Sequence, residues 1–231
     1  MNKAKKLVKA VRKGIEDPAK VKKAMRVLMN EGPQALKRKV YMNVSGEMPV
    51  VHVKRVKLRN YSGDIKFSVV MPVYNVEIRW LEAAIASIEK QNYKNWEICI
   101  ADDCSTKEEV RSYLKSIESK KIKVTYLAEN QGISGATNAA AELATGDYIL
   151  LMDNDDELVV NAMDEFYQAI KRENPDVLYS DMDMIDAEGN AHNPLLKPDW
   201  SPDLLLSQMY IGHLLGFRRS LFVTVGGFRA K

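Results

Sequence analysis

The chain has 231 residues, of which 46% are hydrophobic and 28% charged, a composition that excludes an intrinsically disordered protein. Its two cysteines, Cys99 and Cys104, are too few for a disulfide-stabilised scaffold, and with only three histidines a zinc centre is not expected. No stretch approaches the roughly 18–20 apolar residues that a transmembrane helix needs, so we expect a cytoplasmic protein.

The total charge of +3 is distributed unevenly along the chain. Residues 1–60 contain seventeen Lys and Arg against four Asp and Glu, which gives +13 for this segment and −10 for the rest. Such an asymmetry predicts a basic segment joined to an acidic body. We therefore divide the chain into a basic helical N-terminal extension over residues 1–64 and a larger domain over residues 65–231.

The extension is predicted to be helical. Residues 7–15 fit a basic amphipathic helix, Asp17-Pro18 is typical of the start of a second helix that Gly32-Pro33 ends, and residues 50–60 fit a strand or hairpin. The positive charge of residues 1–60 suits contact with an anionic membrane surface or a partner domain. Nucleic acid is not expected as a partner, because Tyr41 is the only aromatic residue there and base stacking requires several.

From Phe67 onward, apolar runs alternate with amphipathic segments. Strands are predicted over residues 67–71, 96–101, 122–127, 147–152 and 176–179. Helices are predicted over 80–91, from a capping box at Thr106–Glu109 to Ile117, over 134–144, and from about Leu158, with Val159 facing inward, to just before Pro175. After Asp181 several prolines predict a loop-rich stretch. The alternation predicts an α/β fold with a mostly parallel sheet that helices cover on both faces.

Polar residues follow four of the predicted strands. Ligands bind beyond the carboxyl ends of the strands in an open α/β sheet, so these residues are candidates for a single site. They are Tyr74 and Asn75 after the first strand, Asp102 and Asp103 after the second, Asn130 and Gly132 after the third, and Asp153, Asp155 and Asp156 after the fourth.

The three carboxylates after the fourth strand repel one another unless they are protonated or bind a cation. Hard oxygen atoms of this kind suit Mg²⁺ or Mn²⁺, and a solvated turn that caps the next helix is the alternative. The pair Asp102-Asp103 either begins the following helix or accepts hydrogen bonds from a nucleotide base or ribose. The segment Asn130–Gly135 matches neither G-x-G-x-x-G nor a Walker sequence, so we expect neither a dinucleotide dehydrogenase nor a P-loop NTPase.

The region from Phe67 to Lys231 resembles a family-2 glycosyltransferase with the type A nucleotide-sugar fold. The motifs that carry the resemblance are Val70–Asn75, Asp102–Thr106, Asn130–Asn138, Gly146-Asp147, Asp153–Asp156 and Val225–Phe228. Two further segments, Lys197–Asp203 and Ile211–Leu214, resemble a subgroup that builds bacterial surface polysaccharides, often by rhamnosyl or related transfers.

The resemblance implies a nucleotide-sugar-binding, Rossmann-like three-layer sandwich. It also implies an inverting, metal-assisted transfer of sugar from a UDP- or dTDP-linked donor to a saccharide or lipid-linked acceptor. The place implied for this reaction is cell-envelope polysaccharide synthesis, with the protein in the cytoplasm at the inner face of the membrane. Mn²⁺ or Mg²⁺ is the implied cofactor, and its implied ligands are Asp153, which also approaches the ribose, and Asp155.

Six further roles are implied residue by residue for the nucleotide sugar. They are Pro72 and Tyr74 lining the base pocket, Asp102 binding uracil or thymine with Asp103 nearby, and Asn130 and Gly132 shaping the nucleotide cleft. Thr137 stands where many relatives carry Arg, which weakens that contact.

The catalytic base is the point at which the sequence departs from the family. In the family this base lies in a Glu-Asp or Gln-Asp pair shortly after the motif that corresponds to Gly226–Phe228. We therefore expect the base beyond Lys231, with Asp181 and Asp183 as weaker candidates within the chain, and a glycosyltransferase domain that is incomplete at its C-terminus. The alternative is a catalytically inactive module that binds a nucleotide sugar or an anionic surface.

One residue in each of the segments Ile211–Leu214 and Lys197–Asp203 has two interpretations. His213 either contacts substrate or packs in the core. Trp200 either stacks on a sugar ring or anchors a loop.

Overall fold

The computed structural model describes residues 60–186 and 189–229. The helices predicted over residues 7–15 and 17–32, and all but the last residue of the strand or hairpin predicted over 50–60, lie outside the described residues. The chain divides into two compact units. One unit contains a six-stranded sheet with its helices, and the described part of the other is a two-stranded hairpin.

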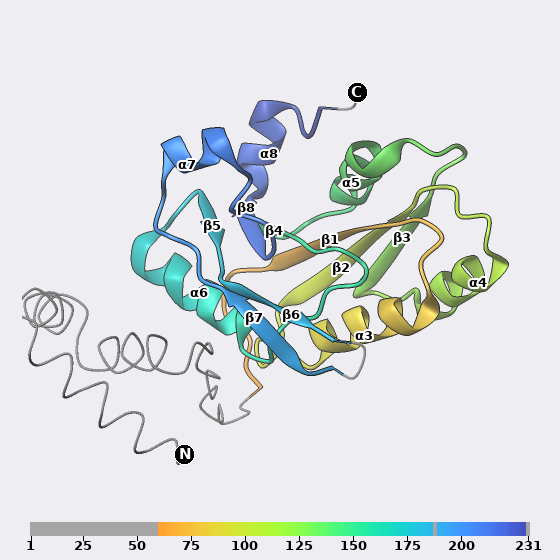
Figure 1. The fold of residues 1–231 in the computed structure, drawn as a ribbon. Coiled ribbons are helices and arrows are strands. Elements are labelled where there is room, and N and C mark those ends of the chain that lie inside the picture. Colours follow the sequence, from red (N-terminus) through yellow and green to blue (C-terminus); the bar gives the residue numbers. More distant parts are fainter. Residues whose placement is uncertain (1–59, 187–188, 230–231) are drawn as a thin grey trace, which may run out of the picture. The chain divides into compact units, whose positions relative to one another are not determined.

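The six strands lie in the order β3-β2-β1-β4-β8-β5 (Figure 1). β1 pairs in parallel with β2 and β4, and β2 with β3, whereas β8 is antiparallel to both β4 and β5. Their bounds are β1 (Phe67–Val73), β2 (Trp96–Asp102), β3 (Ile122–Tyr126), β4 (Tyr148–Leu151), β5 (Val177–Tyr179) and β8 (Leu215–Arg218). The prediction of a mostly parallel α/β sheet is confirmed, with one antiparallel strand that was not predicted.

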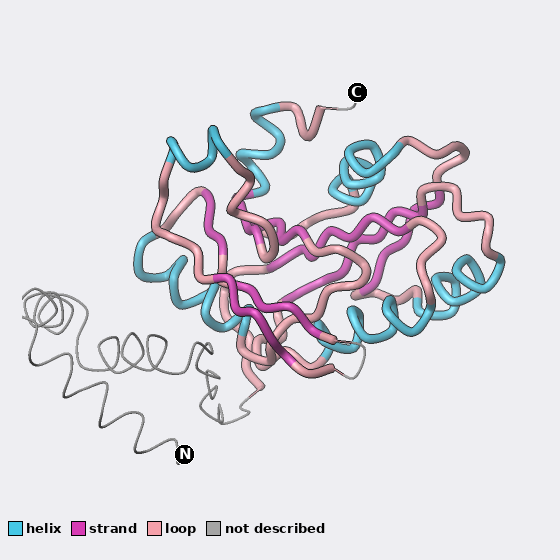
Figure 2. Tube along the Cα trace, in the orientation of Figure 1, coloured by secondary structure: helices cyan, strands magenta, loops and turns pink. Residues whose placement is uncertain are grey.

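Helices cover both faces of this sheet, as the tube drawing shows (Figure 2). One face is covered by α3 (Ile78–Glu89), α4 (Glu108–Ile117) and α6 (Ala162–Glu173), and the other by α5 (Gly132–Glu142) and α8 (Arg219–Val225). The short helix α7 (Pro202–Ser207) precedes β8. The predicted three-layer sandwich is therefore confirmed.

The central position of β1 follows from its sequence. Successive side chains of a strand point to opposite faces, and here both sets are apolar. Val69 and Met71 pack into the core beneath α3, α4 and α6, while Val70 packs against Ala136 and Ala140 of α5. The small alanine side chains let α5 lie close to the sheet.

The unpredicted strand β8 depends on a glycine. A Cβ atom at Gly216 would lie 2.8 Å from Leu150 Cδ2 and 2.9 Å from Phe166 Cε1, closer than packed atoms allow. Its four residues, Leu-Gly-Phe-Arg, contain no β-branched side chain and therefore resemble a loop in sequence. β8 forms because two neighbouring strands supply its hydrogen bonds.

The predicted capping box is wrong. α4 begins at Glu108, its N-cap residue is Lys107 rather than Thr106, and the Lys107 side chain makes no capping hydrogen bond.

The predicted start of the fourth helix is also wrong. α6 begins at Ala162 rather than near Leu158, and the Leu158 N–H donates to Ser87 Oγ of α3 at 3.0 Å. Val159 is 60% exposed, not directed inward as predicted. The acidic segment before it is therefore not an N-cap of α6.

The second unit differs from the loop-rich stretch predicted after Asp181. Its described residues form a two-stranded sheet of β6 (Met182–Ile185) and β7 (Ala191–Leu195). Within the described ranges of the chain, no helix is long and apolar enough to cross a membrane.

A buried carboxylate ties the amino ends of the strands together. Glu97 of β2 is 1% exposed, and its Oε2 lies 2.6 Å from Lys66 Nζ and 2.9 Å from Lys123 Nζ. Its Oε1 accepts hydrogen bonds of 2.7 Å from Ser68 Oγ and from the Thr145 N–H. Burial raises the pKa of Glu97, but the hydrogen bonds from Lys66, Thr145, Lys123 and Ser68 outweigh burial and lower it from 4.5 to about 2.

We predict that Glu97 makes stability dependent on acid. Because its pKa is lower in the folded state, its contribution is fully present above pH 4.5 and is lost as the pH falls towards about 2. Replacement by Gln (Glu97→Gln) should lower the free energy of unfolding at neutral pH by about 3 kcal/mol, and the difference from the original protein should shrink in acid. Urea unfolding measured between pH 7 and pH 2.5 checks this.

The surface variant Glu173→Gln is the control, since Glu173 pairs with Arg172 on an exposed face of α6 and should change stability by about 0.5 kcal/mol or less. A Glu97→Gln deficit that stays constant across this pH range would contradict the prediction.

Candidate active site

The loop after β1 is fastened to the loop after β2 through Asn75. Asn75 Oδ1 accepts hydrogen bonds from the N–H groups of Thr106 (2.8 Å) and Lys107 (3.0 Å), and the Asn75 N–H donates to Ser105 Oγ at 2.9 Å. Asn75 has a φ of 49°, in the left-handed region that asparagine tolerates better than most residues. Asn75 thus fixes the segment that leads into α4, without capping the first turn of that helix.

The loop after β3 is fastened to the same place. Asp103 Oδ1 accepts a hydrogen bond of 2.7 Å from the Gln131 N–H, and Asn130 Nδ2 donates to the Asp103 carbonyl at 3.3 Å. Asn130 Oδ1 in turn accepts from the N–H of Gly132, the first residue of α5, which has a φ of 70°. Three strand-end loops therefore form one hydrogen-bonded rim.

Asp102 is buried beneath this rim, with 1% of its surface exposed. Its Oδ1 accepts from the Ser105 N–H at 3.2 Å, whereas Oδ2 has no hydrogen-bond partner among the described residues and lies 3.9 Å from Arg111 Nε. A buried carboxylate oxygen without a hydrogen bond is costly, and such atoms mark places where a ligand or water can supply a donor.

The acidic loop after β4 joins the same edge. Asn154 Nδ2 donates to the Pro72 carbonyl at 2.8 Å and so fastens this loop to the end of β1. Asp153 and Asp156 are half-buried on either side of this anchor, while Asp155 is exposed.

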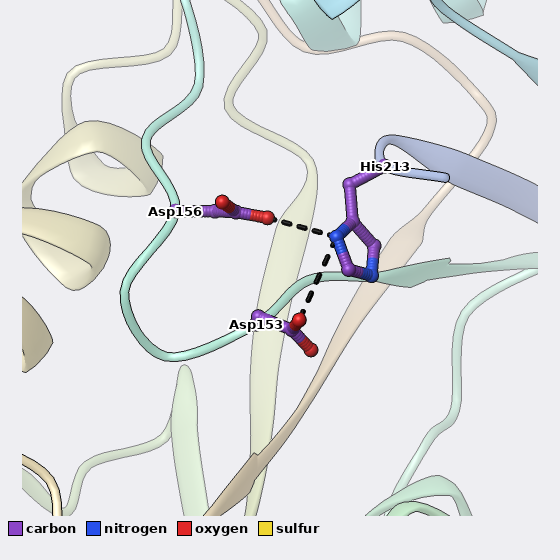
Figure 3. Close-up of side chains that lie close together, drawn as sticks. All are labelled: Asp153, Asp156 and His213. Atoms are coloured by element: carbon purple, nitrogen blue, oxygen red, sulfur yellow. Dashed lines mark ion pairs between the residues drawn. The ribbon is translucent and has the colours of Figure 1, made fainter. Parts of the chain in front are cut away.

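β8 brings His213 to this loop. Leu215, the first residue of β8, pairs with Leu151, the last residue of β4, and the strands are antiparallel, so the residues before β8 meet those after β4. Both carboxylates point towards the His213 ring (Figure 3). His213 Nδ1 lies 2.9 Å from Asp156 Oδ2 and 3.6 Å from Asp153 Oδ2.

These contacts shift the protonation of the cluster. The hydrogen bond to Asp156 raises the pKa of His213 against the effect of burial, and the Asp153 charge adds to the increase. Burial raises the pKa of Asp153, a change that the His213 charge opposes and the neighbouring carboxylates reinforce. The cluster thus holds negative charge in a partly desolvated place.

The geometry fits a divalent cation. One ligand atom from each of Asp153, Asp156 and His213 lies within 4.8 Å of the others. Ligand atoms placed about 2.0–2.2 Å from one ion lie about 3 Å apart, close to the separations found here. Two carboxylates and an imidazole suit Mn²⁺ and related ions, which accept both oxygen and nitrogen ligands.

The loop that carries His213 is held by hydrogen bonds from Ser180 and Lys197. The Ser180 N–H donates to the Leu214 carbonyl at 3.1 Å, and the Leu214 N–H donates to Ser180 Oγ at 3.3 Å. Lys197 Nζ donates to the His213 carbonyl at 2.8 Å, and Asp181 Oδ1 accepts a hydrogen bond of 2.7 Å from the Lys197 N–H. Ser180, Lys197 and Asp181 therefore fix the position of His213, a role that was not predicted from the sequence.

A cleft of about 220 Å3 adjoins the cluster. Its walls come from the ends of β1 and β4, from α5, from the loop before β8 and from the segment after α8. They are formed by Pro72, Ile133, Ser134, Thr137, Leu151, Met152, Asp153, His213 and Phe228.

The wall formed by Phe228 is fixed by α5. Asn138 Nδ2 donates to the Phe228 carbonyl and Asn138 Oδ1 accepts from the Phe228 N–H, both at 2.8 Å. A Cβ atom at Gly227, whose φ is 77°, would lie 2.8 Å from Asn138 Oδ1. This close approach explains the glycine before Phe228.

The structure brings only some of the sequence-predicted site residues to the cleft. Among those predicted for the nucleotide sugar, Pro72 and Asp153 line it, and Tyr74 is 49% exposed at the same edge of the sheet. Asp102, Asp103, Asn130 and Gly132 belong to the rim and are not in its lining. Asp181 is exposed beside Lys197, and Asp183 lies on β6 in the other unit.

Two members of the cluster were not predicted as metal ligands. Asp156 was grouped with the other carboxylates but not assigned as a ligand, and His213 was taken as a substrate contact or a core residue. The His213 side chain is 38% exposed, so it is not packed in the core as one interpretation expected. It contacts the carboxylates of Asp153 and Asp156. The signal that could have identified it is an imidazole in a motif that resembles the same family. Trp200, at 63% exposure, is not buried against the loop that it was predicted to anchor.

Comparison with known proteins agrees with this arrangement. A model of the family described as glycosyl transferase family 2 matches residues 68–226. The O-antigen biosynthesis protein RfbC of Myxococcus xanthus is 34% identical over 166 residues, which are 70% of this chain and 13% of that protein. The Escherichia coli protein named UDP-Glc:alpha-D-GlcNAc-diphosphoundecaprenol beta-1,3-glucosyltransferase WfgD is 30% identical over 53% of this chain and 47% of its own length. The chain thus spans less than half the length of these two relatives.

A solved structure shares the fold. The crystal structure of residues 1–349 of Staphylococcus aureus TarS, in complex with UDP-GlcNAc, superimposes with a TM-score of 0.59 and 24% sequence identity. The match covers 71% of this chain and 49% of that one.

We predict that Asp156 contributes more than Asp155 to cation binding, because Asp156 lies in the cluster and Asp155 is exposed. Calorimetric titration with Mn²⁺ should show that Asp156→Asn and His213→Ala each weaken binding by about tenfold or more. The neighbouring variant Asp155→Asn, which makes the same chemical change one residue away, should weaken binding less. A larger loss in Asp155→Asn would instead support the Asp153–Asp155 pair that was predicted from the sequence.

Proposed function

We propose that this chain, which belongs to glycosyl transferase family 2, binds a nucleoside-diphosphate sugar in the cleft beside Asp153, Asp156 and His213. Its sugar would pass to a saccharide or lipid-linked acceptor in the synthesis of cell-envelope polysaccharide. The observation that carries the proposal is the cation-binding geometry of these three side chains at the wall of a cleft beyond β1 and β4. Ligands of open α/β sheets bind at this edge.

The cofactor we propose is Mn²⁺ or Mg²⁺. Asp153, Asp156 and His213 would hold it, and Asp155 on the same loop is the further ligand proposed from the sequence. When bound, such an ion supplies Lewis-acid charge that stabilises a departing diphosphate. The two half-buried carboxylates favour cation binding because the positive ion would offset the repulsion between their negative charges.

The nucleotide base would lie against the rim formed by the loops after β1 and β2. The exposed ring of Tyr74 and the nearby Pro72 offer it an apolar surface. The Asp102 oxygen that lacks a hydrogen bond would accept one from a base N–H, as uracil and thymine provide.

Asp103, Asn130 and Gly132 would act on the nucleotide mainly by position. Asp103 and Asn130 hold the loop after β3 to the loop after β2, and Gly132 lets the chain turn into α5 at a positive φ. A nucleotide bound there would therefore contact a rim whose shape is fixed before binding, which reduces the entropy lost on association.

The proposed donor and acceptor draw on the relatives. The TarS structure contains UDP-GlcNAc, and the name of WfgD gives UDP-Glc as donor and a diphosphoundecaprenol-linked sugar as acceptor. On this basis we propose a UDP-linked donor, with a dTDP-linked donor as the alternative, and a lipid-linked acceptor.

The reaction we propose is an inverting displacement, in which a carboxylate base removes the proton from the acceptor hydroxyl. Within the chain, Asp181 and Asp183 are the candidates for this base. Asp181 already accepts a hydrogen bond from the Lys197 N–H, which occupies one of its carboxylate oxygens. A base that follows Phe228 in the sequence remains our preferred assignment.

A lipid-linked acceptor also suggests a role for the basic residues 1–60. Their net charge of +13 would attract the segment to an anionic membrane surface, at about 1 kcal/mol for each Lys or Arg close to the surface. We propose peripheral contact of this kind, or contact with a partner domain, and no nucleic-acid binding.

Calorimetry with the full chain tests the proposed function. UDP, or dTDP in its place, should bind at a single site in the presence of Mn²⁺, and removal of the ion by EDTA should weaken binding by about tenfold or more. Asp153→Asn should abolish the dependence on Mn²⁺, since this residue contributes to both the cluster and the cleft.

Glu173→Gln, on an exposed face of α6, is the matched control and should bind the nucleotide as the original chain does. Failure of the original chain to bind either nucleotide would overturn the proposal. If Asp153→Asn bound the nucleotide with the same affinity and the same dependence on Mn²⁺, the acidic cluster would have no part in the proposed site.

A further inference from the structure

Lys197 presents a positive charge beside the cluster. Its Nζ donates to the carbonyl of His213 at 2.8 Å, and its backbone N–H is held by Asp181 Oδ1 at 2.7 Å. The side chain is half-buried. The ammonium group therefore sits behind the residue whose ring faces Asp153 and Asp156.

Within the part of the chain that the structure describes, no carboxylate contacts this ammonium, and the charge of Asp181 acts on it only from beyond 4.0 Å. Three other lysines there have a carboxylate within 4.0 Å: Lys66 and Lys123 contact Glu97, and Lys171 contacts Asp64. For Lys197 no such carboxylate is found among the described residues, and its Nζ has one carbonyl acceptor for three N–H donors. A half-buried charge without a counter-charge costs free energy unless a ligand supplies the opposite charge.

The sign of that ligand follows from the charges around it. A divalent cation in the cluster balances the carboxylates of Asp153 and Asp156, which leaves none of their charge for Lys197. A diphosphate bound to that cation would add negative charge close to His213 and Lys197. An ammonium with free N–H donors forms short, charge-assisted hydrogen bonds with phosphate oxygens.

We propose that Lys197 binds the diphosphate group of the nucleotide donor, an assignment that rests on the proposed function. Asp181 fixes the backbone of Lys197, and the His213 carbonyl holds Nζ next to a residue of the cluster. Lys197 would thereby distinguish a nucleoside diphosphate from a nucleoside.

A different role makes the opposite prediction for the cation. If Lys197 only positioned the His213 loop, its loss would disturb the cluster and weaken Mn²⁺ binding. If it binds the diphosphate, its loss removes a positive charge near the cluster, so Mn²⁺ binding in the absence of nucleotide should stay the same or become tighter.

The test compares UDP with uridine, because uridine lacks the diphosphate. With the full chain at saturating Mn²⁺, Lys197→Met should weaken UDP binding by about tenfold or more and leave uridine binding unchanged. Lys197→Arg, which keeps the charge, should retain most of the UDP affinity. Lys171→Met, which removes an exposed lysine paired with Asp64, is the matched control and should change neither ligand.

The outcomes separate this inference from the proposed function. The role of Lys197 alone would be overturned if Lys197→Met bound UDP as tightly as the original chain does. It would also be overturned if a fall in Mn²⁺ affinity accounted for the weaker UDP binding. An original chain that binds neither UDP nor uridine would overturn the proposed function, and the role of Lys197 with it.

Discussion

The site depends on the pairing of β1 along both of its edges. β2 and β4 run parallel to it, so the ends of all three strands reach the same edge of the sheet, where their loops can bond to one another. Two polar bonds show how closely they are joined: Asn75 reaches the loop after β2, and Asn154 reaches the Pro72 carbonyl. At the other end of the strands, Glu97 and its two lysines set the starting positions. Pairing at both ends of the strands therefore fixes the positions of the polar groups that follow them.

Much of this framework was predictable from the sequence. Strands such as Phe67–Val73 are apolar on both faces, which only a central strand of a covered sheet can accommodate. β8 was not predictable in the same way, because Leu-Gly-Phe-Arg has no pattern of its own and becomes a strand through hydrogen bonds with β4 and β5. The bonds from Asn75 to the segment before α4 were missed for a related reason: Asn75 lies far from that segment in the sequence, whereas the local box at Thr106 suggested a nearer partner.

The candidate site shows the same division. The acidic loop after β4 could be placed from the sequence, since carboxylates that follow an apolar strand are conspicuous. Which carboxylate turns towards the cluster could not, because the difference between Asp155 and Asp156 is the direction of two side chains on one tight loop. His213 and Lys197 became relevant only through tertiary pairing, one by the register of β8 and the other by its bond to a carbonyl.

The register of β4 with β8 has a consequence for how the protein can vary. Asp153 lies two residues after Leu151 and His213 two residues before Leu215, and these leucines face each other, so the distance between the two side chains is set by the sheet. The chain between them is not equally free to change, because Asp156 belongs to the cluster, β5 pairs with β8, and Ser180 and Lys197 bond to the loop of His213. Variation around the cleft is therefore expected in the stretches of this intervening sequence that make none of these contacts.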